Sequence, residues 1–493
     1  MDLKQIPILL KRYDFQSKME ICQLHSSNTM SLKGLIPIEE LRGKILPWDL
    51  ETFALFSVIT FNEYNNRKFE NKKEIQNFTK IINTIKTDQH PRFEDGLNNN
   101  RFLEFFLIVT GLTQFQLQEN ILNKIYRYSY IFNFKNENLD MKQLFHEKFG
   151  CNFNDFIKFG IIIHCYFSKE FTNFRKKDIY NYIFKKYNHV IEHLTINRSE
   201  FVTLQEKVTK NINQYVYGFK YFYQFPFLSY EQNVYLPLPH LIMDSVTTSL
   251  LFRLTEGNNK LRESFGKEVL ENYILQICKT SKYFNEVIEE KEYTYKRNQK
   301  RTLDIMIRKN NQCLMLDSKS MSPRTSLRNL TEKDIDHTIN RLVDCVIQVY
   351  KHITKYFLLE YNPFETEHVF SKNDIFGAVI IFEDSYIHRE VIMRKAAEKL
   401  KMDLDGDEYE YLCANVKLLR LYELEKMIFQ NDDILQLLSI NRQHKDKWFD
   451  FSFIDPTKIK EKQLTDEILQ IDEQINEIYQ EFVSELAKEG IIN

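Results

Sequence analysis

The stretch RTLDIMIRKNNQCLMLDSKS, residues 301–320, decides how this chain is expected to fold. Two arms rich in β-compatible apolar residues flank a pair of asparagines, which tolerate the positive φ that a tight hairpin turn requires. With the asparagines as the central turn residues, Lys309 pairs with Gln312, and counting back along the ladder sets Asp304 directly opposite Asp317. The sequence therefore predicts a β-hairpin on which two carboxylates meet.

Asp304, Asp317 and Lys319 are predicted to share one face of this hairpin. Directly paired residues have Cβ atoms about 5 Å apart, and side chains two positions apart on a strand lie on the same face. Leu316 and Ser318 then point the other way. Two carboxylates at that separation repel each other unless a cation lies between them, and a hard divalent ion such as Mg²⁺ suits them.

Asp304, twelve further residues and then Asp317-Ser318-Lys319 form a pattern that is similar to a known motif. It resembles the D…(D/E)xK signature of the PD-(D/E)XK nuclease superfamily, which has the fold of the restriction endonucleases. Leu303 stands where that family has a proline. The element order expected over residues 260–385, a helix, three strands, a helix and a strand, also resembles the arrangement of that family.

Members of this superfamily also carry an acidic residue on the helix that precedes the sheet. Here the helix-like run 265–277 offers two candidates, Glu268 and Glu271. We favour Glu271, because Leu270-Glu271-Asn272-Tyr273-Ile274 resembles the apolar-Glu-x-aromatic-apolar pattern of the family.

The resemblance implies a Mg²⁺- or Mn²⁺-dependent endonuclease that hydrolyses DNA. Asp304, Asp317 and Glu271 would hold the metal, with the backbone carbonyl of Ser318 as a further ligand, and Lys319 would orient the attacking water and offset charge on the phosphate. A role in restriction or anti-phage defence, with the N-terminal half recognising a target or trigger, is expected from this kind of architecture. The alternative is a catalytically silent nucleic-acid-binding or scaffold protein that keeps the fold.

Basic residues are frequent around the hairpin and have few acidic neighbours in the sequence. They favour contact with a phosphate backbone, although a charged strand edge kept from aggregating would look the same. The candidate DNA-backbone contacts are Lys300, Arg301, Arg308, Lys309 and Arg324.

Composition bounds the remaining possibilities. The 493 residues are 43% hydrophobic and 28% charged, which is typical of a globular protein of two to three domains, and a net charge of −2 gives no global basic field. Seven cysteines occur without a CxxC pair, which argues against a zinc ribbon or a disulfide framework and favours a reducing cytoplasm. The longest apolar runs are too short to cross a membrane, so we expect a cytoplasmic protein.

The predicted fold is a multidomain α+β protein. Residues 1–224 form a mainly helical recognition or regulatory domain, residues 225–400 a restriction-endonuclease-like core with a leading hairpin, and residues 401–493 a helical region. The last helix carries an apolar stripe that could join a second copy or a partner protein, although packing on its own chain is the commoner outcome. Its members are Ile468, Ile471, Ile475, Ile478, Phe482 and Leu486.

Overall fold

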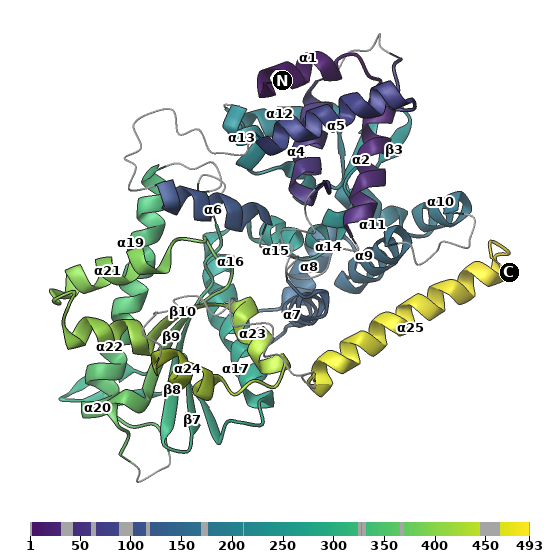
Figure 1. The fold of residues 1–493 in the computed structure, drawn as a ribbon. Helices are drawn as coiled ribbons and strands as arrows, with labels where there is room; N and C mark the ends of the chain where they lie inside the picture. Colours follow the sequence, from purple (N-terminus) through teal and green to yellow (C-terminus); the bar gives the residue numbers. More distant parts are fainter. Residues whose placement is uncertain are drawn as a thin grey trace.

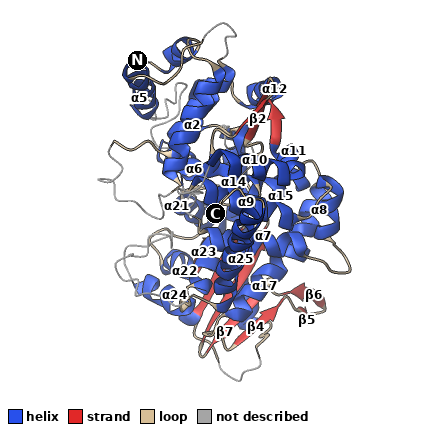
Figure 2. Cartoon of the chain, turned by 90° about the vertical axis from the view of Figure 1, so that its right-hand side faces the viewer, coloured by secondary structure: helices blue, strands red, loops and turns tan. Residues whose placement is uncertain are grey.

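The computed structural model describes residues 2–30, 43–60, 66–87, 102–114, 119–168, 176–210, 212–323, 327, 332–364, 369–443 and 464–492. Within them the chain is a mixed α+β protein in which helices predominate (Figures 1 and 2).

The helices are numbered along the chain. Those before residue 225 are α1 (Ile6–Leu10), α2 (Phe15–Thr29), α4 (Pro47–Ile59), α5 (Lys72–Thr87), α6 (Phe102–Gln114), α7 (Ile121–Asn133), α8 (Met141–Phe149), α9 (Phe153–Phe167), α10 (Lys176–Lys186), α11 (Asn188–Leu194), α12 (Arg198–Val208) and α13 (Ile212–Tyr217). Those after it are α14 (Ile242–Ser245), α15 (Thr248–Thr255), α16 (Asn259–Ser264), α17 (Glu271–Thr280), α19 (Glu332–Lys351), α20 (Phe357–Leu359), α21 (Arg389–Leu400), α22 (Asp407–Asn415), α23 (Leu421–Phe429), α24 (Ile434–Gln443) and α25 (Asp466–Lys488).

A five-stranded sheet with the order β10-β9-β8-β7-β4 lies at the opposite end of the molecule from α1 and α2 (Figure 1). Strand β7 is antiparallel to both β4 and β8, whereas β8, β9 and β10 are parallel to one another. The strands are β4 (Glu286–Glu289), β7 (Ile305–Lys309), β8 (Gln312–Lys319), β9 (Ile375–Ile381) and β10 (Val416–Arg420).

The predicted hairpin is present as β7 and β8. Lys309 pairs with Gln312, and Asn310 takes the positive φ of 52° that the turn requires. Alternate strand residues enter two different cores: Leu314 packs in the core that contains α17, and Met315 packs in the core that contains α19. Because helices cover both faces of the sheet, both sides of these strands are apolar.

Strand β10 was not expected from the sequence, which suggested only helices beyond residue 390. Residues Val416–Arg420 pair in parallel with β9 and are fully enclosed. A short apolar run of this length is compatible with a strand or a buried helix, and only a free sheet edge selects the strand.

A second, three-stranded sheet has the order β1-β2-β3. The predicted hairpin around residue 231 is present as β2 (Phe227–Tyr230) and β3 (Asn233–Tyr235), with Glu231 at φ 53°. However, β1 (Thr195–Asn197) adds in parallel to β2. The hairpin therefore belongs with the preceding helices rather than with the five-stranded sheet.

The hydrophobic cores cross the predicted domain boundaries. One core combines α1, α2, α4 and α5 with residues 196–241, and so continues past residue 224. Helix α6 lies outside that core, because Phe105 and Ile108 pack with α19 and one face of the large sheet. Strand β10 and helix α23, which fall in the predicted C-terminal region, complete the sheet and its other face.

Helix α25 lies along α7 and α9 (Figure 1, yellow). Ile468, Ile471, Phe482 and Leu486 of its apolar stripe are buried within the chain. The stripe is therefore used for intramolecular packing, the commoner of the two expected outcomes.

Candidate functional site

Asp304 lies immediately before β7, where the regular ladder has already ended. The last β7–β8 pair is Ile305 with Leu316, so the predicted direct pairing of Asp304 with Asp317 is not formed. Instead Asp304 Oδ2 accepts hydrogen bonds from the backbone N–H of Ser318 at 2.6 Å and from its hydroxyl at 2.9 Å. The Ser318 side chain, expected to point away, is thus part of the site.

A bulge explains why Asp304 leaves the ladder. Strand β4 pairs with β7 up to Glu289 and Ile305, and a further ladder resumes at Glu292 and Arg301. Between these pairs, the two residues 290 and 291, which follow β4, lie opposite the three residues 302–304, which precede β7. Such an extra residue bends the strand and re-aims a side chain, which is common beside functional sites.

Asp317 and Lys319 lie two residues apart on β8 and form an ion pair. Lys319 Nζ is 2.7 Å from Asp317 Oδ2, and the Asp317 residue is only 1% exposed. Burial, together with the nearby Asp304 carboxylate, raises the pKa of Asp317 to about 6, although Lys319 opposes the shift. Burial alone would lower the pKa of Lys319, but attraction to Asp317 outweighs it, and the net pKa is raised. Lys319 is therefore held as an ammonium ion.

Glu271, at the start of α17, faces the same site. Burial is the main reason that its pKa rises to about 8, and the carboxylates of Asp304 and Glu290 raise it further while Lys319 lowers it. Glu268 points elsewhere, because its two carboxylate oxygens accept hydrogen bonds from the side-chain amides of Asn136 at 2.7 Å and Asn138 at 3.2 Å. Glu271, and not Glu268, is thus the glutamate of this segment whose pKa is raised by the Asp304 carboxylate.

A π-helical turn, Phe265–Leu270, directly precedes Glu271 and packs against the end of β8. A Cβ atom added to Gly266 would lie 2.8 Å from Ser320 Oγ, so the absence of a side chain permits this close approach. Wide helical turns of this kind occur frequently at functional sites. Here the turn sets the position from which Glu271 reaches the strand ends.

Two neighbours of the site were missed by sequence reasoning. Gln348 of α19 points its amide nitrogen at Asp317 Oδ1 at 3.5 Å. Glu290, the residue after β4, interacts electrostatically with Asp304. No spacing rule separates Gln348 from other polar residues on α19, because only the docking of that helix on the sheet brings it to Asp317.

The basic residues near the hairpin are more fully paired than the sequence suggested. Four of the five candidate DNA contacts form ion pairs with carboxylates that are distant in the sequence or on a neighbouring strand. The pairs are Lys300 with Glu360 at 2.7 Å, Arg301 with Glu292 at 2.7 Å and Glu290 at 3.3 Å, Arg308 with Glu286 at 2.9 Å, and Lys309 with Asp433. Arg324 lies outside the described residues. The expectation that few acids oppose these cations is therefore wrong, and their contact with DNA stays a prediction.

The donor chemistry of the site suits a hard divalent ion, although the side chains are not assembled around a common point. Across the residues that the structure describes, no group of three His, Cys, Asp or Glu side chains is arranged to hold a metal ion. Asp317 Oδ2 has Lys319 as its ion-pair partner, and burial, with a further contribution from the Asp304 carboxylate, raises the pKa values of Asp317 and Glu271. A cation would relieve that repulsion.

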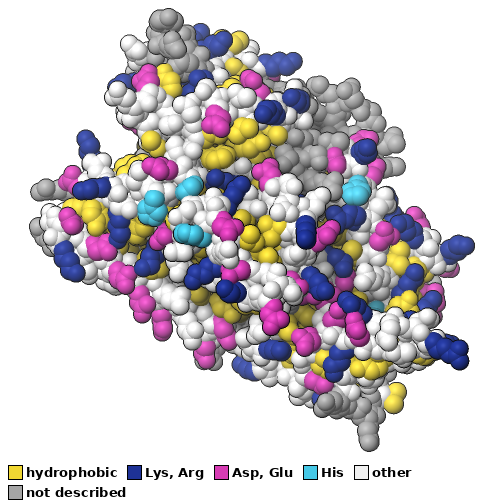
Figure 3. All heavy atoms as spheres, turned by 180° about the vertical axis from the view of Figure 1, so that it is seen from behind, with side chains coloured by type: hydrophobic (Ala, Val, Ile, Leu, Met, Phe, Trp, Pro, Cys, Tyr) yellow, Lys and Arg dark blue, Asp and Glu magenta, His cyan; other side chains and the backbone are white. Residues whose placement is uncertain are grey.

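Comparisons with protein-family models, with curated proteins and with solved structures found no match. The interpretation of the site therefore depends on its own geometry. In the described part of the chain, no helix combines the length and the apolar character needed to cross a membrane. Positive and negative side chains are interspersed over the face shown in Figure 3, in keeping with the net charge of −2.

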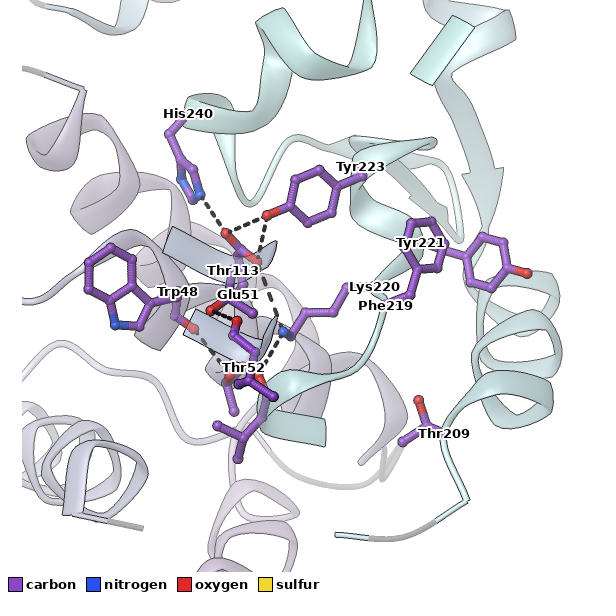
Figure 4. Close-up of polar contacts among 12 residues, drawn as sticks. Trp48, Glu51, Thr52, Thr113, Thr209, Phe219, Lys220, Tyr221, Tyr223 and His240 are labelled. Carbon is purple, nitrogen blue, oxygen red and sulfur yellow. Dashed lines mark hydrogen bonds and ion pairs between the residues drawn. The ribbon is translucent and has the colours of Figure 1, made fainter. Parts of the chain in front are cut away.

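A second polar cluster lies in the N-terminal core, around Glu51 of α4 (Figure 4). The Tyr223 hydroxyl is 3.2 Å from both Glu51 carboxylate oxygens, His240 Nε2 is 3.4 Å from Oε1, and Lys220 Nζ is 4.0 Å from Oε2. Ser26 Oγ lies 2.7 Å from the other ring nitrogen of His240, but Ser26 is completely buried. With its hydroxyl inaccessible, this cluster ties separate chain segments together and is not a second reactive site.

Proposed function

We propose that this protein is a metal-dependent nuclease that hydrolyses phosphodiester bonds in DNA, with a core of the PD-(D/E)XK type. The observation that carries the proposal is the gathering of Asp304, Asp317 and Lys319 at neighbouring strand ends, with Glu271 facing them. Apart from the separate two-stranded ribbon of residues 292–301 and the short helix α20, the order α17, β4, β7, β8, α19, β9 supports it, because it matches the helix, three strands, helix and strand expected for that core. The helical N-terminal half would recognise the target in a restriction or defence role.

In this proposal Asp304, Asp317 and Glu271 hold Mg²⁺ or Mn²⁺, which supplies positive charge for the phosphate oxygens. The Ser318 backbone carbonyl is a further candidate ligand. Lys319, kept as an ammonium ion, orients the attacking water and offsets negative charge rather than acting as a base. The water oxygen would bond to phosphorus and lose a proton to solvent, the bond from phosphorus to the leaving oxygen would break, and the leaving oxygen would take up a proton from solvent.

One observation favours the alternative, a silent nucleic-acid-binding or scaffold protein. Asp304 already accepts two hydrogen bonds from Ser318, and Asp317 is already paired with Lys319. Because these side chains already bind one another, they could stabilise the fold without binding a metal ion or cleaving a substrate. The proposed nuclease requires that a metal ion displaces part of this internal pairing.

Cleavage of a supercoiled plasmid with Mg²⁺ tests the proposal. Wild type should cut, and Asp317→Ala and Lys319→Ala should each lose cutting while remaining folded. Asp344→Ala is the matched control, because it breaks an Asp–Lys pair of similar separation, 3.0 Å to Lys399, on exposed helix surfaces. Duplex binding without cutting under Mg²⁺ or Mn²⁺ would contradict the nuclease and support the scaffold.

A further inference from the structure

A two-stranded ribbon projects from the edge of the large sheet next to the site. It consists of β5 (Glu292–Tyr295) and β6 (Asn298–Arg301), which pair only with each other. The ribbon connects the end of edge strand β4 to Asp304, and Figure 2 shows it standing beyond the red strands of the sheet. The ribbon ends three residues before Asp304 in the chain.

The tip of the ribbon is formed by two basic residues in an unfavourable backbone conformation. Lys296 has φ 48° and Arg297 has φ 68°. A turn with two successive positive φ values strongly prefers Asn-Gly, and each ordinary residue placed there costs about 1 kcal/mol or more. Strain that persists in this way is typical of functional positions.

The two tip cations are also not neutralised by the protein. Both are exposed, and among the described residues no carboxylate is within ion-pair distance of either one. Lys296 lies 5.1 Å from the ring centre of Tyr295, and that contact leaves its charge uncompensated. They differ in this respect from Lys300, Arg301, Arg308 and Lys309, all of which are paired.

The base of the ribbon is held in place. The Tyr293 ring stacks on Tyr361 with centroids 4.8 Å apart and planes 10° apart, and its hydroxyl lies 3.2 Å from Glu360. Lys300 Nζ is 2.7 Å from both oxygens of the same Glu360. At the root, the Lys291 N–H donates to the Thr302 hydroxyl at 2.8 Å. The tip is thus presented on a fixed support.

We propose that this ribbon enters the major groove of B-form DNA and places Lys296 and Arg297 against the duplex while the phosphate backbone of the DNA approaches Asp304. The inference rests on the proposed nuclease function and specifies that the substrate is double-stranded DNA. Strands of four residues extend about 14 Å, and a two-stranded ribbon fits a groove about 12 Å wide and 8.5 Å deep. The major groove of an RNA duplex is deep and too narrow for side chains to read, so duplex DNA is favoured over duplex RNA.

The experiment compares binding in an Asp317→Ala background, where cleavage does not interfere. The double variant Lys296→Asn with Arg297→Gly removes both charges and installs the residues that the turn prefers, so folding is retained or improved. We expect its affinity for a labelled DNA duplex to fall about 10-fold or more, and the slope of log affinity against log salt to decrease by about 2. Lys401→Gly is the control. Lys401, at the end of α21, is also an exposed lysine with a positive φ of 59°, so this change removes a similar charge and a similar strain elsewhere.

Affinity for one strand of the same DNA and for an RNA duplex of the same length should be lower than affinity for the DNA duplex. Both of these affinities should change little in the ribbon variant. Unchanged affinity for duplex DNA, or an equal loss for all three nucleic acids, would overturn the ribbon proposal. The two proposals fail separately. Ribbon-dependent binding with no cutting by wild type would refute the nuclease alone, and cutting that is insensitive to the ribbon variant would refute the ribbon alone.

Discussion

Asp304 Oδ2 accepts a hydrogen bond of 2.6 Å from the backbone N–H of Ser318, one residue beyond Asp317 on the neighbouring strand. A side-chain carboxylate thus bonds to the backbone of β8 just past the point where the β7–β8 ladder ends. This bond fixes the first acid of the site although that acid belongs to no strand. The Ser318 hydroxyl adds a second bond to the same oxygen at 2.9 Å.

Replacing Ser318 with alanine should remove one of these two bonds and leave the other. A hydrogen bond to a charged group contributes about 1.5–3 kcal/mol, so plasmid cleavage by Ser318→Ala should fall about 10-fold or more, with no change in circular dichroism. Ser439→Ala is a suitable control, since Ser439 accepts a bond from Gln312 at the other end of β8. Equal activity in both variants would show that the hydroxyl has no positioning role.

The two glutamates of the helix that precedes the sheet should behave differently. Glu271→Gln removes the carboxylate next to Asp304 and should abolish cleavage, because a neutral amide binds a divalent cation poorly. Glu268→Gln keeps a polar group beside Asn136 and Asn138 and should retain most of the activity. Rates measured with Mg²⁺ under identical conditions decide between them, and a reversed order would refute the assignment of Glu271.

Mg²⁺ should stabilise the folded protein through this site. Because the carboxylates of Asp304, Asp317 and Glu271 repel one another, millimolar Mg²⁺ should raise the melting temperature of wild type, and EDTA should reverse the rise. The rise should be clearly smaller for Asp317→Asn, which removes one charge. Identical shifts in the two proteins, followed by differential scanning fluorimetry, would show that the ion binds elsewhere.

Glu425 should be important for stability without touching the site. It is fully buried, and its oxygens accept bonds from Arg127 at 2.7 and 2.5 Å and from the Tyr273 hydroxyl at 2.7 Å. Glu425→Ala leaves the buried Arg127 guanidinium with Glu119, 3.4 Å away, as its remaining acidic partner among the described residues, and should lower the free energy of unfolding by about 3 kcal/mol in urea titrations. Combining Glu425→Leu with Arg127→Met should recover much of that loss, and failure to do so would indicate a packing defect instead.

His352 should make stability depend on pH below neutrality. Burial lowers its pKa to about 4, against the opposing pull of Glu360, whereas in the unfolded chain it titrates at its ordinary value of 6.5. The unfolded state therefore binds more protons between these values, and stability is lost as pH falls through that window. Between pH 7 and pH 5 wild type should lose about 2 kcal/mol more than His352→Leu, as judged by urea unfolding at each pH. Parallel losses in the two proteins would contradict this.

The sequence predicted those features of the site that depend on neighbours along the chain. The asparagine turn fixed the pairing of Lys309 with Gln312, and strand alternation separated Asp317 and Lys319 from Leu316. Continuing the same count to Asp304 was wrong, because the β7–β8 ladder ends at Ile305, next to the bulge at residues 302–304 that separates the β4–β7 pairing from the β5–β6 pairing. Turn chemistry is local, whereas a bulge depends on how two distant strands meet.

The sequence by itself determined the hairpin, the helix that follows it, the buried strand β9 and the identity of the acids and the lysine that come together. Only the tertiary structure decided that Glu271 rather than Glu268 faces them, that Gln348 reaches Asp317, and that most nearby cations are already paired. Backbone periodicity is set by residues a few positions apart, so it can be read from one segment. Side-chain partners far apart in the sequence are set by the packing of whole helices and strands, and no single segment contains that information.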